Sequence, residues 1–89
     1  MTQYTQTGLE RRHLRSQAQK LEAVVRVGQQ GIDPVLPNVE TALQHHPLIK
    51  VRFDAQKDQK RELALELAQK THSELVQVIG HIAVLYRPK

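Results

Sequence analysis

Cysteine and tryptophan are absent from this chain of 89 residues, and only 3% of its residues are aromatic. Without cysteine the chain has no disulfide scaffold, no thiolate zinc site and no cysteine nucleophile. The aromatic residues Tyr4, Phe53 and Tyr86 are too few to form a sheet surface on which nucleic-acid bases stack. These absences exclude disulfide-stabilised folds, thiolate zinc domains and aromatic stacking platforms.

Long apolar runs are also missing. The longest uninterrupted runs are a few residues, far short of the ~20 needed to span a bilayer. The first seven residues are polar and lack the apolar core of a signal peptide. We therefore expect a cytoplasmic protein with no membrane partner. A hydrophobic content of 39% suits one domain over residues 1–89, with little core to spare for a deep pocket that would hold a small-molecule substrate.

The charge is positive and unevenly placed. Thirteen Lys and Arg residues stand against nine Asp and Glu residues, a net charge of +4, and the pI is about 9.8. Residues 1–27 hold five bases and two acids, Arg87 and Lys89 add two bases, and the middle is nearly balanced. If folding joins the two ends, they form one basic patch, which favours a polyanionic partner.

Hydrophobic periodicity and turn residues predict seven elements. Helices are expected over about 8–20, from 34 to about 45 and over about 57–70, and strands over 23–27, from 48 or 49 to 53, over 75–79 and over 82–86. Gly80 and His81 join the last two strands tightly, which is typical of a hairpin. The predicted order is αβαβαββ, an α/β domain with its helices packed against one sheet.

Local signals at the helices lead to more specific expectations. Thr7 and Glu10 have the spacing of a capping box, and Asp33 is expected to cap the second helix, with Pro34 at its first position. Glu66 and Lys70 are spaced to pair along the third helix. The first helix is expected to bury one stripe, formed by Leu14, Ala18 and Leu21.

Three arginines lie beside this stripe. Arg11, Arg12 and Arg15 fall within an arc of ~100° on the predicted helix. A run of charge is most often a solvated helix face. Here few acids balance it, so we also expect these side chains to contact phosphates.

The sequence Gly28-Gln29-Gln30-Gly31 lies between a predicted strand and a predicted helix. Backbone without Cβ atoms approaches a phosphate closely, and the two glutamines offer uncharged hydrogen-bond donors. An ordinary strand-to-helix turn explains the glycines equally well, and the carboxylate of Asp33 competes with an anion at the same helix end.

No pattern indicates catalysis. The five histidines lack the spacing of metal ligands, and neither serine lies in a nucleophile motif. We therefore expect no enzyme, no metal site and no cofactor.

Four collinear segments resemble the YhbY-like family of CRM domains, and together they cover about residues 7–88. They are Arg11-Arg12-x-Leu14-Arg15, Val24-Val25-x-Val27-Gly28-x-x-Gly31, Ala42-Leu43-x-His45-His46-x-Leu48-Ile49-Lys50-Val51 and Val76-Gln77-Val78-Ile79-Gly80-x-x-x-Val84-Leu85-Tyr86-Arg87-Pro88. The resemblance implies a two-layer α/β sandwich with a four-stranded mixed sheet, similar to the C-terminal domain of translation initiation factor three.

The resemblance also implies RNA binding and a role in assembly of the large ribosomal subunit, with rRNA or a precursor particle as partner. It implies that residues 28–31 form a KH-like RNA-contacting loop flanked by the basic first helix. Members often carry lysine in this loop, where this chain has Gln29 and Gln30, so we expect attraction to come from arginines elsewhere. The predicted RNA-binding residues are Gly28, Gln29, Gln30, Gly31, Arg11, Arg12, Arg15, Arg26, Lys50 and Arg52.

Two alternatives to this hypothesis stay open. The chain is also consistent with a small RNA-binding regulator of particular transcripts, or with an adaptor whose basic face binds an acidic protein. We expect it to act as a monomer.

Overall fold

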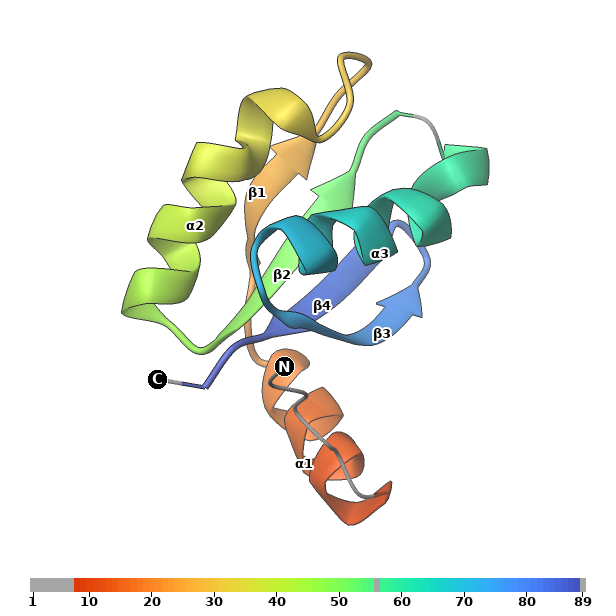
Figure 1. Cartoon of the computed structure of the whole chain (residues 1–89). Coiled ribbons are helices and arrows are strands. Elements are labelled where there is room, and N and C mark those ends of the chain that lie inside the picture. Colours follow the sequence, from red (N-terminus) through yellow and green to blue (C-terminus); the bar gives the residue numbers. More distant parts are fainter. Residues whose placement is uncertain (1–7, 56, 89) are drawn as a thin grey trace.

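The computed structural model describes residues 8–55 and 57–88 (Figure 1). Its elements are α1 (Gly8–Ala18), β1 (Ala23–Val27), the 3-10 turn η1 (Asp33–Val35), α2 (Leu36–His45), β2 (Leu48–Phe53), the 3-10 turn η2 (Lys57–Gln59), α3 (Lys60–Lys70), β3 (Glu74–Ile79) and β4 (Ile82–Tyr86). This order confirms the predicted αβαβαββ arrangement and the α/β class. No helix in the described ranges is long and apolar enough to cross a membrane.

The four strands form one mixed sheet in the order β1-β2-β4-β3. β1 and β2 run parallel, whereas β4 is antiparallel to both β2 and β3. β1 and β2 are parallel neighbours joined by a crossover through α2, as a parallel connection requires. The four-stranded mixed sheet is therefore confirmed.

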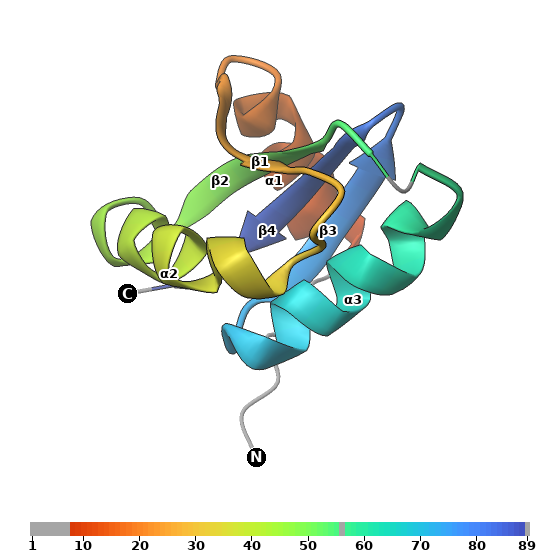
Figure 2. The ribbon, with the colours of Figure 1, turned by 90° about the horizontal axis from the view of Figure 1, so that it is seen from above.

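The helices cover both faces of the sheet, which the expected two-layer sandwich does not describe. α2 and α3 lie together on one face, and α1 lies on the other (Figures 1 and 2). Alternating residues of β2 explain this, because Ile49 and Val51 pack in the α2–α3 core while Leu48 packs with Leu14 of α1. A two-layer description applies to α2, α3 and the sheet, and α1 adds a third layer.

The buried stripe of α1 is shorter than predicted. Leu14 and Ala18 are buried against Val76 and Val84 of the sheet, but Leu21 is 37% exposed. The helix ends at Ala18, and the backbone N–H of Leu21 donates to the Ala18 carbonyl in the turn that follows. Leu21 therefore leaves the helical face that its spacing indicates. The predicted capping box involves Thr7, which lies outside the described residues.

The start of α2 also differs from its prediction. Asp33 lies inside the 3-10 turn η1, whose N-cap is Ile32, and the N-cap of α2 is Val35, so neither cap position holds Asp33. One carboxylate oxygen of Asp33 instead accepts from Nζ of Lys70, on α3, at 3.2 Å. The prediction of an Asp33 cap is therefore wrong, since other residues hold the cap positions and the carboxylate binds a distant lysine. The predicted end of the helix near His45 is confirmed.

The third helix and the hairpin follow the predictions closely. Glu66 and Lys70 form the expected ion pair at 2.9 Å. Gly80 adopts a φ of +56° in the turn between β3 and β4, which confirms the hairpin. His72 also has a positive φ, +54°, directly after the end of α3. This residue therefore holds a left-handed conformation that glycine adopts at less cost.

Candidate nucleic-acid interface

Three loops lie at one end of the sheet. β1 and β2 are parallel and both end there, and the β3–β4 turn lies at the same end because β4 is antiparallel to β2. Backbone hydrogen bonds join these loops: Asp54 N–H donates to the Val27 carbonyl at 2.9 Å, and Phe53 N–H donates to the His81 carbonyl at 2.7 Å. The predicted glycine loop is thus part of a connected surface, which we call the loop end.

The glycine loop is a closed turn. The N–H of Gly31 donates to the carbonyl of Gly28 at 3.1 Å. Gly31 has a φ of +84°, in the left-handed region. A side chain at this position would strain the backbone, so the fold itself requires glycine at position 31.

Gly28 has no such structural requirement. Its φ lies outside the left-handed region, and a Cβ atom built on it would meet no atom within 4 Å. The residue is exposed, as are Gln29 and Gln30 at the tip. The backbone at Gly28 is therefore open to close approach from outside, which is the property that glycine provides beside a bound phosphate.

Two of the predicted arginines lie next to this loop. Arg26 and Arg52 are in register across the parallel strands β1 and β2. Alternation along each strand places both on the face of the sheet that carries α1, opposite Val27 and Phe53. Their side chains remain 70% and 48% exposed. Lys50, two residues before Arg52 on the same face, is half-buried.

The carboxylate of Asp54, the residue directly after β2, lies between these arginines. Oδ1 of Asp54 accepts a hydrogen bond from Nε of Arg52 at 3.0 Å. Its other oxygen, Oδ2, is 3.9 Å from an Nη of Arg26. The positive charge next to the loop is therefore partly neutralised. The sequence gives only a weak indication that Asp54 contacts Arg26, because the two residues meet only when β1 pairs with β2.

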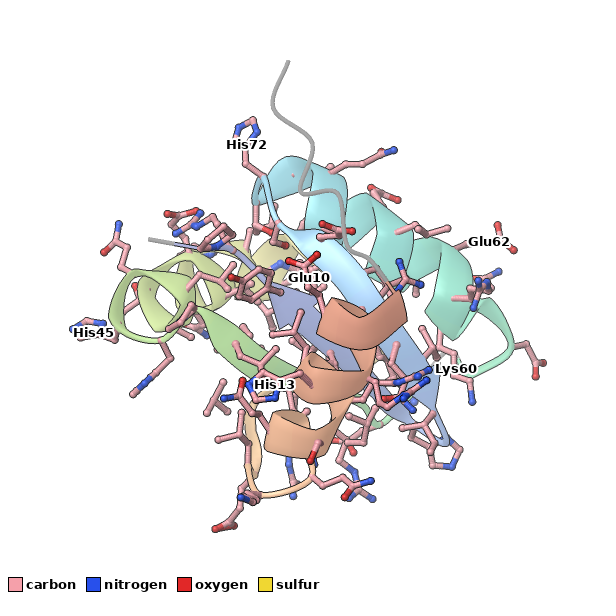
Figure 3. All side chains as sticks on the ribbon, turned by 90° about the horizontal axis from the view of Figure 1, so that it is seen from below. Glu10, His13, His45, Lys60, Glu62 and His72 are labelled. Atoms are coloured by element: carbon pink, nitrogen blue, oxygen red, sulfur yellow. The ribbon has the colours of Figure 1, made fainter. Side chains whose placement is uncertain are left out.

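The arginines of α1 belong to the layer on the other face of the sheet from α2 and α3. Arg11, Arg12 and Arg15 are all exposed. In Figure 3, Glu10 and His13 lie on one side of α1 and Lys60 on the other. The helical repeat places Arg15 about 200° from His13 around the axis, so Arg15 faces the Lys60 side. Lys60 itself donates to the carbonyl of Gly80, in the hairpin turn at the loop end.

The family resemblance implied that the first helix flanks the glycine loop. In the structure the helix does not lie directly beside the loop. Figure 1 shows the loop at the top of the molecule and α1 at the bottom, with the sheet between them. The loop continues into α2 and so bends toward the α2–α3 layer. Arg26 and Arg52 lie beside the loop, on the face of the sheet that carries α1. Together with the loop they form a strip across this end, and the arginines of α1 lie beyond it in the α1 layer.

Arg87, near the C-terminus, lies outside that strip. Arg87 donates from both Nη atoms to the carboxylate of Glu40, at 2.9 Å each, and also to the carbonyl of Thr71 at 2.8 Å. These hydrogen bonds hold the pKa of Glu40 below its usual value. The expectation that both chain ends supply one basic patch is therefore not met for Arg87, and Lys89 lies outside the described residues.

The described part of the chain holds no group of three or more His, Cys, Asp or Glu residues arranged to bind a metal ion. His45 and His46 are both exposed near the end of α2. Nδ1 of His45 lies 2.9 Å from the Thr41 carbonyl, within its own helix.

Comparisons with known proteins agree with this fold. The chain is 40% identical over 81 residues to a Haemophilus influenzae protein named RNA-binding protein, and the match covers 89% of this chain and 82% of the relative. It is 38% identical over 86 residues to a Methanocaldococcus jannaschii protein named probable RNA-binding protein, covering 93% of this chain but only 64% of that longer relative.

A solved structure is also similar. The solution structure of a Staphylococcus aureus protein superposes with a TM-score of 0.82 at 38% sequence identity. The match covers 96% of this chain and 91% of the other. The family model described as the CRS1 / YhbY (CRM) domain matches residues 7–87. The chain therefore belongs to the CRS1/YhbY family of CRM domains.

Proposed function

We propose that this protein binds RNA through the strip that crosses the loop end. Its relatives from Haemophilus influenzae and Methanocaldococcus jannaschii carry RNA binding in their names. The strip consists of the turn Gly28–Gly31 with Arg26 and Arg52, continued by the arginines of α1. Backbone amides and guanidinium groups contact phosphates and position the RNA, so recognition depends on its shape and backbone more than on base sequence.

The observation that carries this proposal is the glycine at position 28. Neither backbone conformation nor crowding requires glycine there, because its φ is not left-handed and the space around it is open. Glycine costs conformational entropy on folding, so a position with no structural need for it is a small loss of stability. Close approach of a phosphate to the backbone explains why a side chain is absent.

The RNA partner that we propose is large-subunit rRNA or its precursor particle, with the chain acting as a non-catalytic assembly factor. The resemblance to YhbY-like proteins supports this part of the proposal. We take the chain to act as a monomer in the cytoplasm. Sedimentation of cell extracts tests this role: the protein should travel with free large-subunit precursors, and its absence from every ribosomal fraction would contradict assembly while leaving RNA binding open.

The binding experiment compares Gly28→Ala with the wild-type chain. We expect the methyl group to weaken binding of an rRNA fragment several-fold at fixed salt, because it blocks close approach to the turn. Thermal stability should be kept or slightly raised, since the added Cβ meets nothing within 4 Å and alanine loses less chain entropy on folding. Unchanged affinity would remove the glycine loop from the interface. Asn38→Ala, at an exposed position of α2, is the matched control and should leave affinity unchanged.

A further inference from the structure

We infer that the RNA bound by this surface is double-helical, and that the protein contacts the backbones of both strands. This inference rests on the proposed RNA binding. Two clusters of arginine carry it. The strand cluster is Arg26 and Arg52, at the end of the sheet beside the glycine loop. The helix cluster is Arg11, Arg12 and Arg15, on α1.

The two clusters occupy different layers of the fold. The strand cluster lies on the sheet itself, whereas the helix cluster projects from α1, which stands on the sheet (Figure 3). An α-helix with its side chains is about 10–12 Å across, so the clusters meet a ligand at different heights. A flexible single strand would lose conformational entropy to bridge this step, whereas a duplex presents two rigid rows of phosphates and loses little.

In the part of the chain that the structure describes, no Phe, Tyr or Trp ring is exposed for unpaired bases to stack on, and the exposed rings near the proposed surface are those of His13 and His81. Among the described residues, Phe53 is 1% exposed and fully within the core, and Tyr86 is partly buried against the α1–sheet cluster. Stacking on aromatic side chains contributes about 1–3 kcal/mol per base in single-strand binding. With two small imidazole rings in place of a stacking platform, affinity comes chiefly from phosphate and ribose contacts, which a duplex provides without exposing its bases.

The outer face of α1 favours RNA over DNA. Ser16 lies opposite the buried residues Leu14 and Ala18 and is exposed. Its hydroxyl group both donates and accepts hydrogen bonds. The wide, shallow minor groove of A-form RNA displays ribose 2′-hydroxyl groups to such side chains, and duplex DNA has none. The ligand class is therefore an A-form duplex, bound along its minor groove.

The test compares three ligands of matched sequence at one salt concentration: an RNA duplex, the corresponding DNA duplex and each single RNA strand. A duplex of about 20 base pairs exceeds the roughly 16 that a double-stranded-RNA-binding domain spans. We expect the RNA duplex to bind at least tenfold more tightly than either alternative. Equal or tighter binding of a single strand or of DNA overturns this inference. Failure to bind any RNA would contradict the proposed function itself.

Charge-neutralising variants test the two-cluster geometry. Arg12→Gln with Arg15→Gln removes charge from the helix cluster, and Arg26→Gln with Arg52→Gln removes it from the strand cluster. We expect each pair to lower the slope of log affinity against log salt by about one for every phosphate that the variant no longer neutralises. If either arginine pair leaves duplex affinity and slope unchanged, the two-cluster geometry is wrong.

Discussion

Arg26 and Arg52 face each other across the parallel strands β1 and β2, and the carboxylate of Asp54 contacts both guanidinium groups. Two like charges directly opposite on neighbouring strands repel each other. Asp54 offsets that repulsion in the free protein. In the proposed mode of binding, an RNA phosphate approaches these same guanidinium groups, and the carboxylate would then oppose binding.

Asp54→Asn is expected to strengthen RNA binding. The substitution keeps the size of the side chain but removes one negative charge next to the glycine loop. Exposed ion pairs contribute about 0.2–1 kcal/mol, which corresponds to a gain of up to roughly fivefold at low salt. A titration with labelled RNA measures it, and Glu62→Gln on α3 is a control with the same charge change. Weaker binding by Asp54→Asn would show that the carboxylate acts mainly by holding the arginines in position.

The two glycines of the loop are expected to differ in their effect on stability. Gly31→Ala should lower the free energy of unfolding by about 1–2 kcal/mol, because the φ of +84° is unfavourable for a residue with a Cβ. Gly28→Ala should change it by less than about 0.5 kcal/mol. Chemical denaturation of both variants makes the comparison. Equal losses of stability would contradict the separate roles of the two positions.

His72→Gly is expected to stabilise the protein. His72 holds a φ of +54° after α3, and Ser73 N–H donates to the Ala68 carbonyl at 2.8 Å, which is the pattern of a glycine-terminated helix. Glycine removes the strain of the left-handed conformation, but it also gives the unfolded chain more entropy, which offsets part of the gain. The free energy of unfolding should rise by about 0.5–1 kcal/mol. Gln69→Gly, within the last turn of α3, should instead lose about 1 kcal/mol. Thermal unfolding distinguishes the two, and destabilisation by both would refute the prediction.

Glu40 is expected to make stability depend on pH. Its pKa is lowered in the folded state, chiefly by hydrogen bonds from Arg87. Because the pKa of Glu40 is lowered in the folded state, the stability that its charge provides is fully present above the ordinary value of 4.5. That stability is lost as the pH falls through the folded pKa. At neutral pH, Glu40→Gln should lose about 0.5–1 kcal/mol, because the pair is bidentate but half-exposed.

Denaturation at a series of pH values checks this prediction. The wild-type chain should lose its advantage over Glu40→Gln once the pH is well below 4.5. A difference between the two proteins that stays constant as the pH falls from neutral through the acid range would show that the carboxylate contributes nothing through its charge.

Much of the fold follows from local sequence signals. The β-branched run Ala23–Val27 ends at a glycine, and its predicted bounds match β1, just as the alternation of Leu48–Phe53 matches β2. The hairpin at Gly80 and the pair Glu66–Lys70 were also predictable. Each of these features depends on residues within a few positions of each other, where backbone geometry alone decides which side chains meet.

The candidate site was predictable as a set of residues but not as a surface. The sequence indicated the glycine turn and the arginines, yet not that Asp54 lies between Arg26 and Arg52. That contact requires β1 and β2 to be parallel and in register, which no local pattern specifies. The aspartate after β2 therefore has a clear role only once the strands are paired.

The absences in the sequence determined by themselves that no disulfide or thiolate metal site supports this protein and that it has few aromatic rings. Hydrophobic periodicity determined the order of its helices and strands, because the helical repeat and the alternation along a strand are both properties of the local backbone. Only the tertiary structure decided that α1 covers the second face of the sheet and that Glu40 neutralises Arg87. These outcomes depend on contacts between residues distant in the chain, since burial of apolar faces on both sides of the sheet selects which side chains meet.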